Sequence, residues 1–203
     1  MSTLSDLRNA LRVLLNDGVA GSYLWEDSTL NLHLNDALRS YGRSFPLERE
    51  TTITTVAGQA AYDLPSDCVA VVKVAVPEAA QDVMVEGGDA TGTGYELFGG
   101  KLLLLPAPAE DGQSIVVRYL AAHAPLVLDA DVSSVSAFDE DLILAFAAAR
   151  ALQSLAMEEA KRQLFEQRAG QSAAAAAALY WEQYVSGVRG RGTGIRAGRL
   201  VAL

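Results

Sequence analysis

Apolar residues recur at helical spacing over the first 45 residues of the chain. The first series predicts an amphipathic helix that ends at Asp17-Gly18, and its apolar face consists of Leu4, Leu7, Leu11 and Leu14. A second helix is expected after Trp25, where Asp27 or Ser28 can cap free backbone N–H groups. Its apolar face consists of Leu30, Leu34, Ala37 and Tyr41, and it should end near Gly42. Two short amphipathic helices therefore open the chain.

Between about residues 51 and 120 the pattern changes to one typical of β-strands. Residues 51–56, 69–76 and 114–120 are rich in β-branched side chains, which favour strands. Residues 95–98 and 101–105 flank Gly99-Gly100, and paired glycines can supply the positive φ angles of a two-residue hairpin turn. This stretch predicts a small antiparallel β subdomain.

The helical pattern returns after Ser136. Three acids, Asp139, Glu140 and Asp141, place negative charge where the helix dipole favours it, at a helix N-terminus. One further long helix is expected from about Phe165 to Tyr184, with a kink possible at Gly170. From Gly187 onward the chain has no apolar periodicity, so we expect it to be disordered in an isolated subunit.

These segments predict an α+β, mainly helical fold: a four-helix scaffold with an inserted small antiparallel β subdomain and a flexible C-terminal arm. The expected divisions are the N-terminal helices at residues 1–48, the β subdomain at 49–125, the long helices at 126–186 and the arm at 187–203. A chain of 203 residues that is 50% apolar can bury an ordinary core.

Charge is distributed unevenly along the chain. The net charge is −9, but the last 17 residues hold four arginines and no acid, so residues 1–186 carry −13. An acidic body argues against general DNA binding, because affinity for phosphate comes from Lys and Arg. The basic end is instead a candidate contact arm.

Cysteine content and hydropathy point to a chain that folds in a reducing cytoplasm. Cys68 is the only cysteine, which excludes an internal disulfide and a zinc site built on paired cysteines. No apolar run approaches the roughly 20 residues needed to cross a bilayer. The first residues also lack the basic and apolar regions of a signal peptide.

Catalytic motifs are not recognisable in the sequence. His33 and His123 are the only histidines, and neither belongs to a metal-binding pair. The segment from Gly94 to Lys101 superficially resembles a phosphate-binding loop, but a leucine follows Lys101 where Ser or Thr is needed. No G-x-S-x-G nucleophile motif occurs. We therefore expect a protein that is not an enzyme, with no catalytic residue, no cofactor and no metal.

Three stretches carry a resemblance to a known family. They are Trp25-x-Asp27-x-x-Leu30 with Leu34-Asn35-Asp36-Ala37-Leu38, Tyr62-Asp63-Leu64-Pro65-x-Asp67, and the alanine-rich helix pair between Leu142 and Trp181. Together with the order of helices, β insertion, helices and basic arm, they resemble the head–tail connector (adaptor) proteins of tailed bacteriophages. The resemblance covers most of the chain.

The resemblance implies a virion protein at the head–tail junction, synthesised in the host cytoplasm. Its implied partners are the portal protein, the next neck or tail protein, and further copies of itself in a ring expected to be dodecameric. DNA would pass through the ring without specific binding, and no membrane is involved. The ring would extend the DNA channel and provide the docking platform for the tail. Many such components stay monomeric until the portal templates their assembly.

Two groups of site residues are expected from this interpretation. The portal-binding arm would use arginines to pair with carboxylates and apolar side chains to dock; it comprises Arg189, Arg191, Ile195, Arg196, Arg199, Leu200, Val201 and Leu203. Acids that face the channel would repel DNA phosphates; the candidates are Asp139, Glu140, Glu158 and Glu159.

Several alternatives remain at this point. A head-closure or tail-completion protein is one, although such proteins tend to be smaller and dominated by β-structure. A small enzyme would need His33 or His123 to meet an acid and a nucleophile, and a DNA-contacting packaging factor is disfavoured by the acidic body. The arm itself could be a tail without a partner, or could bind DNA weakly and with a strong dependence on salt.

Overall fold

The computed structural model describes residues 1–19, 21–75, 83–87, 94–155 and 158–199, with the backbone alone at 83–85 and 192–199. The chain divides into two compact units. The helical unit combines Met1–Phe45 with His123–Leu203, and the β unit is Pro46–Ala122. The chain therefore leaves the helical unit once and returns to it.

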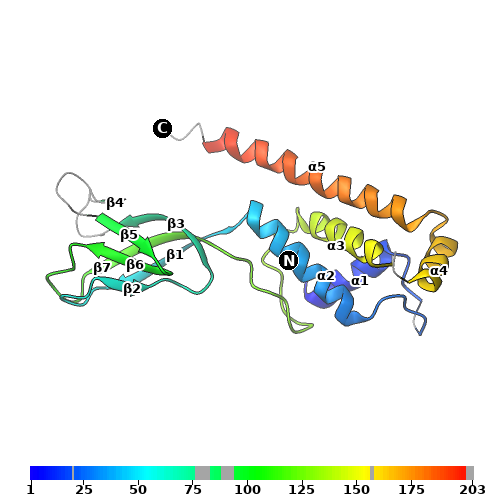
Figure 1. Cartoon of the computed structure of the whole chain (residues 1–203), viewed down its shortest axis with the longest axis horizontal. Coiled ribbons are helices and arrows are strands. Elements are labelled where there is room, and N and C mark those ends of the chain that lie inside the picture. The colour runs from blue at the N-terminus through cyan, green and yellow to red at the C-terminus, as the bar shows by residue number, and fades with distance from the viewer. Residues whose placement is uncertain (20, 76–82, 88–93, 156–157, 200–203) are drawn as a thin grey trace. The chain divides into compact units, whose positions relative to one another are not determined.

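Five helices occur among the described residues of the helical unit (Figure 1): α1 (Leu4–Leu14), α2 (Asp27–Ser44), α3 (Glu140–Ser154), α4 (Glu159–Ala169) and α5 (Ala173–Arg199). The expectation of one long last helix is wrong, which gives five helices in place of the four expected. Gly170 adopts the left-handed conformation, with φ of 66°, and its N–H donates to the carbonyl of Glu166. That geometry ends α4, because glycine takes a positive φ without steric cost.

Helix α3 is the centre of the helical unit. It lies between α2 and α5 (Figure 1), and its small side chains are buried on both sides. The buried alanines are Ala145, Ala147, Ala148, Ala149 and Ala151. Small side chains allow neighbouring helices to approach closely. The leucines predicted for α1 and α2 complete the same core with one exception: Leu14 is 37% exposed, and Leu15 is buried in its place. Helices α1 and α2 confirm the first two predicted helical segments.

The β unit contains seven described strands: β1 (Leu47–Thr54), β2 (Ala61–Asp63), β3 (Cys68–Ala75), β4 (Val83–Glu86), β5 (Gly94–Phe98), β6 (Lys101–Leu105) and β7 (Ser114–Ala121). Strands β1-β7-β3 and β2-β6-β5 each form an antiparallel group of three. Strand β4 joins the groups, because it pairs antiparallel with β3 and parallel with β5. The unit has its own core, around Tyr62, Val74, Tyr95, Leu102, Leu104, Ile115 and Val117.

The β5–β6 hairpin is confirmed at the predicted turn. Gly99 and Gly100 have φ angles of 59° and 77°, and Phe98 pairs with Lys101 across them. Both positive φ values match the turn that paired glycines favour. The fold is thus α+β, with an antiparallel β insertion that contains one parallel strand pair. None of the described helices is long and apolar enough to cross a membrane.

The prediction that the chain is disordered from residue 187 onward is wrong for residues 187–199. Helix α5 continues through Arg199 instead of ending near Tyr184. The glycines at 187 and 190 each disfavour a helix by about 1 kcal/mol relative to alanine. Tertiary contacts of Gly187, Val188 and Arg191 with the rest of the helical unit offset this cost locally. Residues 200–203 lie outside the described part of the chain.

Candidate functional site at the basic end of helix α5

Helices α3 and α5 run antiparallel (Figure 1) and are in close contact at Gly187. A β-carbon at this position would collide with the side chain of Leu142 on α3. Any larger residue at 187 would therefore force the end of the Leu142 side chain to move, so packing, and not backbone conformation, favours glycine here. This contact sets the register of the two helices, so that Arg191 on α5 reaches the residues just before α3.

Arg191 is held at the start of α3 by an ion pair. Its Nη2 lies 2.5 Å from Oδ1 of Asp139 and donates to the carbonyl of Phe138 at 3.0 Å. Asp139 occupies the N-cap position of α3 and is only 7% exposed. A buried carboxylate needs partners, and both the arginine and the helix dipole supply positive charge. The basic end of α5 is thereby tied to the core.

A second element completes the surroundings of Asp139. The Tyr41 hydroxyl on α2 donates to Oδ2 of Asp139 at 2.8 Å. Burial raises the pKa of the Tyr41 hydroxyl, and the hydrogen bond to Asp139 raises it further. The tyrosine therefore stays protonated and keeps donating throughout the physiological pH range. Three helices, α2, α3 and α5, meet at this one carboxylate.

In the described part of the chain, neither histidine has both an acid and a nucleophile among its hydrogen-bond partners. The ring of His123 interacts through Nδ1 with Ser134 Oγ at 2.8 Å and through Nε2 with the carbonyl of Phe45 at 2.9 Å. Both nitrogens thus have structural partners. The ring nitrogens of His33 are covered and have no hydrogen-bond partner among the described residues, and burial lowers the pKa of His33.

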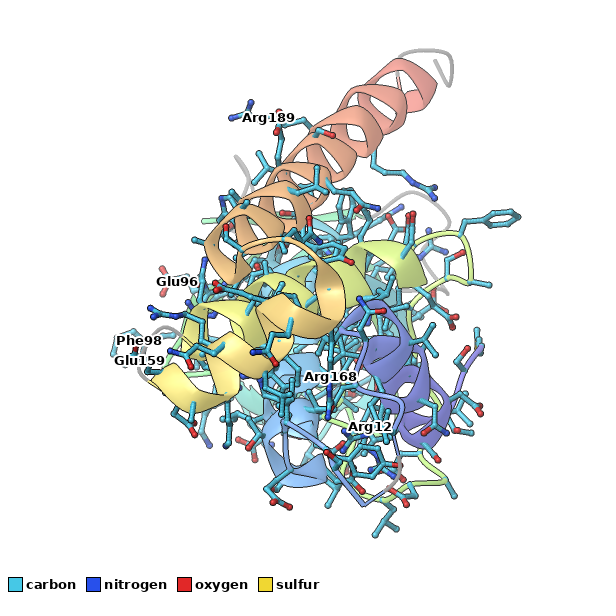
Figure 2. The ribbon with its side chains drawn as sticks, turned by 90° about the vertical axis from the view of Figure 1, so that its right-hand side faces the viewer. Arg12, Glu96, Phe98, Glu159, Arg168 and Arg189 are labelled. Carbon is cyan, nitrogen blue, oxygen red and sulfur yellow. The ribbon has the colours of Figure 1, made fainter. Side chains whose placement is uncertain are left out.

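The structure separates the residues expected in the portal-binding arm. Arg189 is exposed and points outward from α5 (Figure 2), whereas Arg191 is paired with Asp139. Ile195, Arg196 and Arg199 belong to the helical backbone of α5 that extends past the start of α3 (Figure 1). Leu200, Val201 and Leu203 lie outside the described residues. The binding role of the arm stays a prediction.

The four acids expected to face the channel have different surroundings. Asp139 is buried and paired, which removes it from the acids that can repel DNA. Glu140 accepts hydrogen bonds from the backbone N–H and the hydroxyl of Ser2 at 2.9 and 2.7 Å. Glu158 and Glu159 are exposed at the start of α4, where Glu158 forms an ion pair with Lys161 at 2.8 Å and Glu159 lies 3.5 Å from Arg162. Only these last two present carboxylates mainly to solvent.

Sequence reasoning missed a buried ionic network around α1. Arg12 Nη1 lies 2.5 Å from Asp17, which is fully buried, and Arg12 Nη2 lies 2.6 Å from Asp27. The expected capping role of Asp27 is wrong, because α2 has no side-chain cap and the carboxylate pairs with arginine instead. Arg168 on α4 also approaches Asp17, at 3.9 Å, so the network joins α1, α2 and α4 (Figure 2).

Comparison with known proteins identifies one family. The family model described as SU10 adaptor protein matches residues 2–197 of the chain. A search of curated proteins returned no match. The family match covers both the helical unit and the inserted β unit, and it includes the basic end of α5 up to the residue after Arg196.

Proposed function

The chain belongs to the SU10 adaptor protein family of phage head–tail adaptors, and from this we propose that it assembles as a ring beneath the portal. In this position the ring extends the DNA channel and gives the tail its docking platform. The protein acts by binding and not by catalysis. The single observation that carries the proposal is the family match over residues 2–197.

The basic end of α5 is the proposed portal contact. Arg191 and Asp139 hold the helix against the core, and the following eight residues extend past the start of α3. Arg196 and Arg199 lie in this extension, with no acidic residue after Glu182. Arginine pairs with carboxylates through two parallel hydrogen bonds, so an acidic surface of the portal is the expected partner.

The acidic body suits a DNA channel. Residues 1–186 carry a net charge of −13. Carboxylates on a channel wall repel phosphate, so DNA can slide without adhering. Glu158 and Glu159 remain the candidates for this role because their side chains are exposed, with exposed fractions of 53% and 74%.

A pull-down with the portal protein from the same genome tests the proposal. The full chain is compared with a chain that ends at Arg191, which keeps the anchoring ion pair and lacks the extension. We expect the full chain to bind portal rings and the shortened chain to lose most of the binding. Arg196→Glu with Arg199→Glu in the full chain should have the same effect.

The control is Arg39→Glu with Arg43→Glu, which reverses two exposed charges on α2 and leaves the extension intact. This variant should bind the portal like the parent chain. Binding by the shortened chain at full strength would disprove the arm as the contact, and failure of the full chain to bind would disprove the adaptor function itself.

A further inference from the structure

The connection between the β unit and α3 presents apolar side chains to solvent. Three lie within six residues: Val127, Leu128 and Val132 are 74%, 66% and 55% exposed. We define residues 126–132 as the apolar loop. Contiguous exposed apolar side chains on a protein surface often mark a site of contact with another protein.

Hydrogen bonds hold the apolar loop in one conformation. Asp131 Oδ2 accepts from the backbone N–H groups of Val127 and Leu128 at 2.7 and 2.8 Å. Arg8 on α1 forms a two-pronged contact with Asp129, with Nη1 and Nη2 at 2.8 and 3.1 Å from its two oxygens. Because the loop is already ordered, binding through it costs little conformational entropy.

The helical unit also contains a hollow of about 570 Å³ between α3, α4 and α5. We define it as the alanine groove, lined by Leu152, Gln153, Arg162, Glu166, Ala173, Ala174, Ala177, Ala178 and Trp181. The Glu166 carboxylate accepts from the N–H of Ala173 at 3.2 Å and is used within the subunit. Arg162 is only loosely paired, at 3.5 Å from Glu159, and Arg150 reaches Gln153 at the groove.

The negative charge of the apolar loop distinguishes between two hollows of the helical unit that could bind it. Asp129 and Asp131 are charged, since hydrogen bonds to Arg8 and to the backbone lower their pKa values. A second apolar hollow, of about 350 Å³ between α1, α3 and α5, has Asp141 as its charged lining residue and would repel the loop. The alanine groove has Arg162 and Glu166 in its lining and Arg150 beside it, so the net charge of these three residues is positive and attracts the loop instead.

The loop and the groove lie on opposite sides of α3. The loop is bound to α1 through Arg8 and to α2 through Asn35, which bonds both the N–H and the carbonyl of Leu126. The groove is lined by residues of α3, α4 and α5, and α5 lies on the side of α3 opposite to α2 (Figure 1). A copy therefore cannot fill its own groove, and two different surfaces of identical copies can meet head to tail.

We propose that the apolar loop of one copy inserts into the alanine groove of a second copy. The inference rests on the proposed function, because a head-to-tail contact that closes on itself generates a ring. Val127 and Leu128 fill the groove beside Trp181, and Asp129 meets Arg162 at its edge. Repetition of this one contact accounts for a ring in which every subunit has the same surroundings.

Crosslinking between single-cysteine chains tests the contact. Cys68→Ser removes the native thiol, and Leu128→Cys and Ala178→Cys are introduced in separate chains, which are mixed at high concentration with a short bis-maleimide. The mixture should crosslink several times faster than a mixture of Ala178→Cys with Val69→Cys, whose valine is 65% exposed in the β unit. A chain that carries both new cysteines should give a ladder beyond dimer.

Charge provides an independent readout of the same contact. Arg150→Glu with Arg162→Glu should slow the crosslinking several-fold, and added salt should slow the parent reaction because it screens exposed charges. Equal rates for the test and control mixtures, or dimers formed by Leu128→Cys alone, would overturn the proposal. If the chains crosslink but do not bind the portal, the subunit interface stands and the adaptor function is rejected. If they bind the portal but do not crosslink, the adaptor function stands and this interface is rejected.

Discussion

The guanidinium of Arg191, near the end of the chain, lies 2.5 Å from the carboxylate of Asp139, which begins helix α3. This pair fixes where the anchored part of α5 ends and where its basic extension begins. The side chain of Asp139 is 9% exposed and that of Arg191 is 45% exposed. A half-exposed arginine is partly screened by water, so the contribution of the pair lies between those of surface and buried ion pairs.

Arg191→Ala should lower the free energy of unfolding by about 1–2 kcal/mol, because Asp139 then keeps only the Tyr41 hydroxyl as a side-chain partner. Urea unfolding measures the change. Arg189→Ala is the matched control, since Arg189 is exposed on the same helix, and it should change stability by less than about 0.5 kcal/mol. Equal effects of the two substitutions would show that the ion pair contributes nothing.

Gly187→Ala and Gly190→Ala should act in opposite directions. A methyl group at 187 collides with Leu142, and the resulting overpacking should cost about 1–3 kcal/mol. A methyl group at 190 would meet no atom within 4 Å, so the substitution should stabilise the helix by up to about 1 kcal/mol. Thermal unfolding of both variants checks the sign. A stabilised Gly187→Ala variant would contradict the close approach of α3 and α5.

His33 should make the helical unit less stable as pH falls from 7 to 5. Burial holds the pKa of His33 below its ordinary value of 6.5, and Arg150 lowers it further while Asp36 opposes the shift. The unfolded chain therefore binds a proton that the folded chain resists, so stability is full above pH 6.5 and is lost below it. His33→Gln cannot take up this proton, and urea unfolding at both pH values should show a smaller decline.

The same pH series can contradict the interpretation of His33. The parent chain and the His33→Gln variant share every other titrating group, so the difference between their declines reports His33 alone. Identical declines would mean that His33 is protonated as easily in the folded chain as in the unfolded one.

Arg12→Ala should be among the most destabilising substitutions in the chain. It leaves Asp17, which is fully buried, without its closest cation, and removal of one partner from a buried pair costs about 3–5 kcal/mol. Arg12→Lys should recover only part of the loss, since lysine cannot reach Asp17, Asp27 and the Trp25 carbonyl together. Chemical unfolding measures both, with the exposed Arg43→Ala as control.

Local signals explain what the sequence determined about this protein. The leucine spacing of α1 and α2, the β-branched strands and the Gly99-Gly100 hairpin depend on residues within a few positions of one another. The acids at the start of α3 follow the same logic, because the helix dipole acts over one turn. The family resemblance rested on the order of such segments, and the family match over residues 2–197 confirms it.

Contacts between distant residues were decided by the tertiary structure alone. Arg8 meets Asp129 and Arg191 meets Asp139 across long stretches of chain, and neither residue type indicates its partner. The sequence predicted a disordered arm from Gly187 because this stretch has no apolar periodicity, and its glycines also disfavour a helix. Packing against Leu142 and the pairing of Arg191 offset that weak propensity, and a gain that arises only when α3 and α5 meet leaves no local pattern in the sequence.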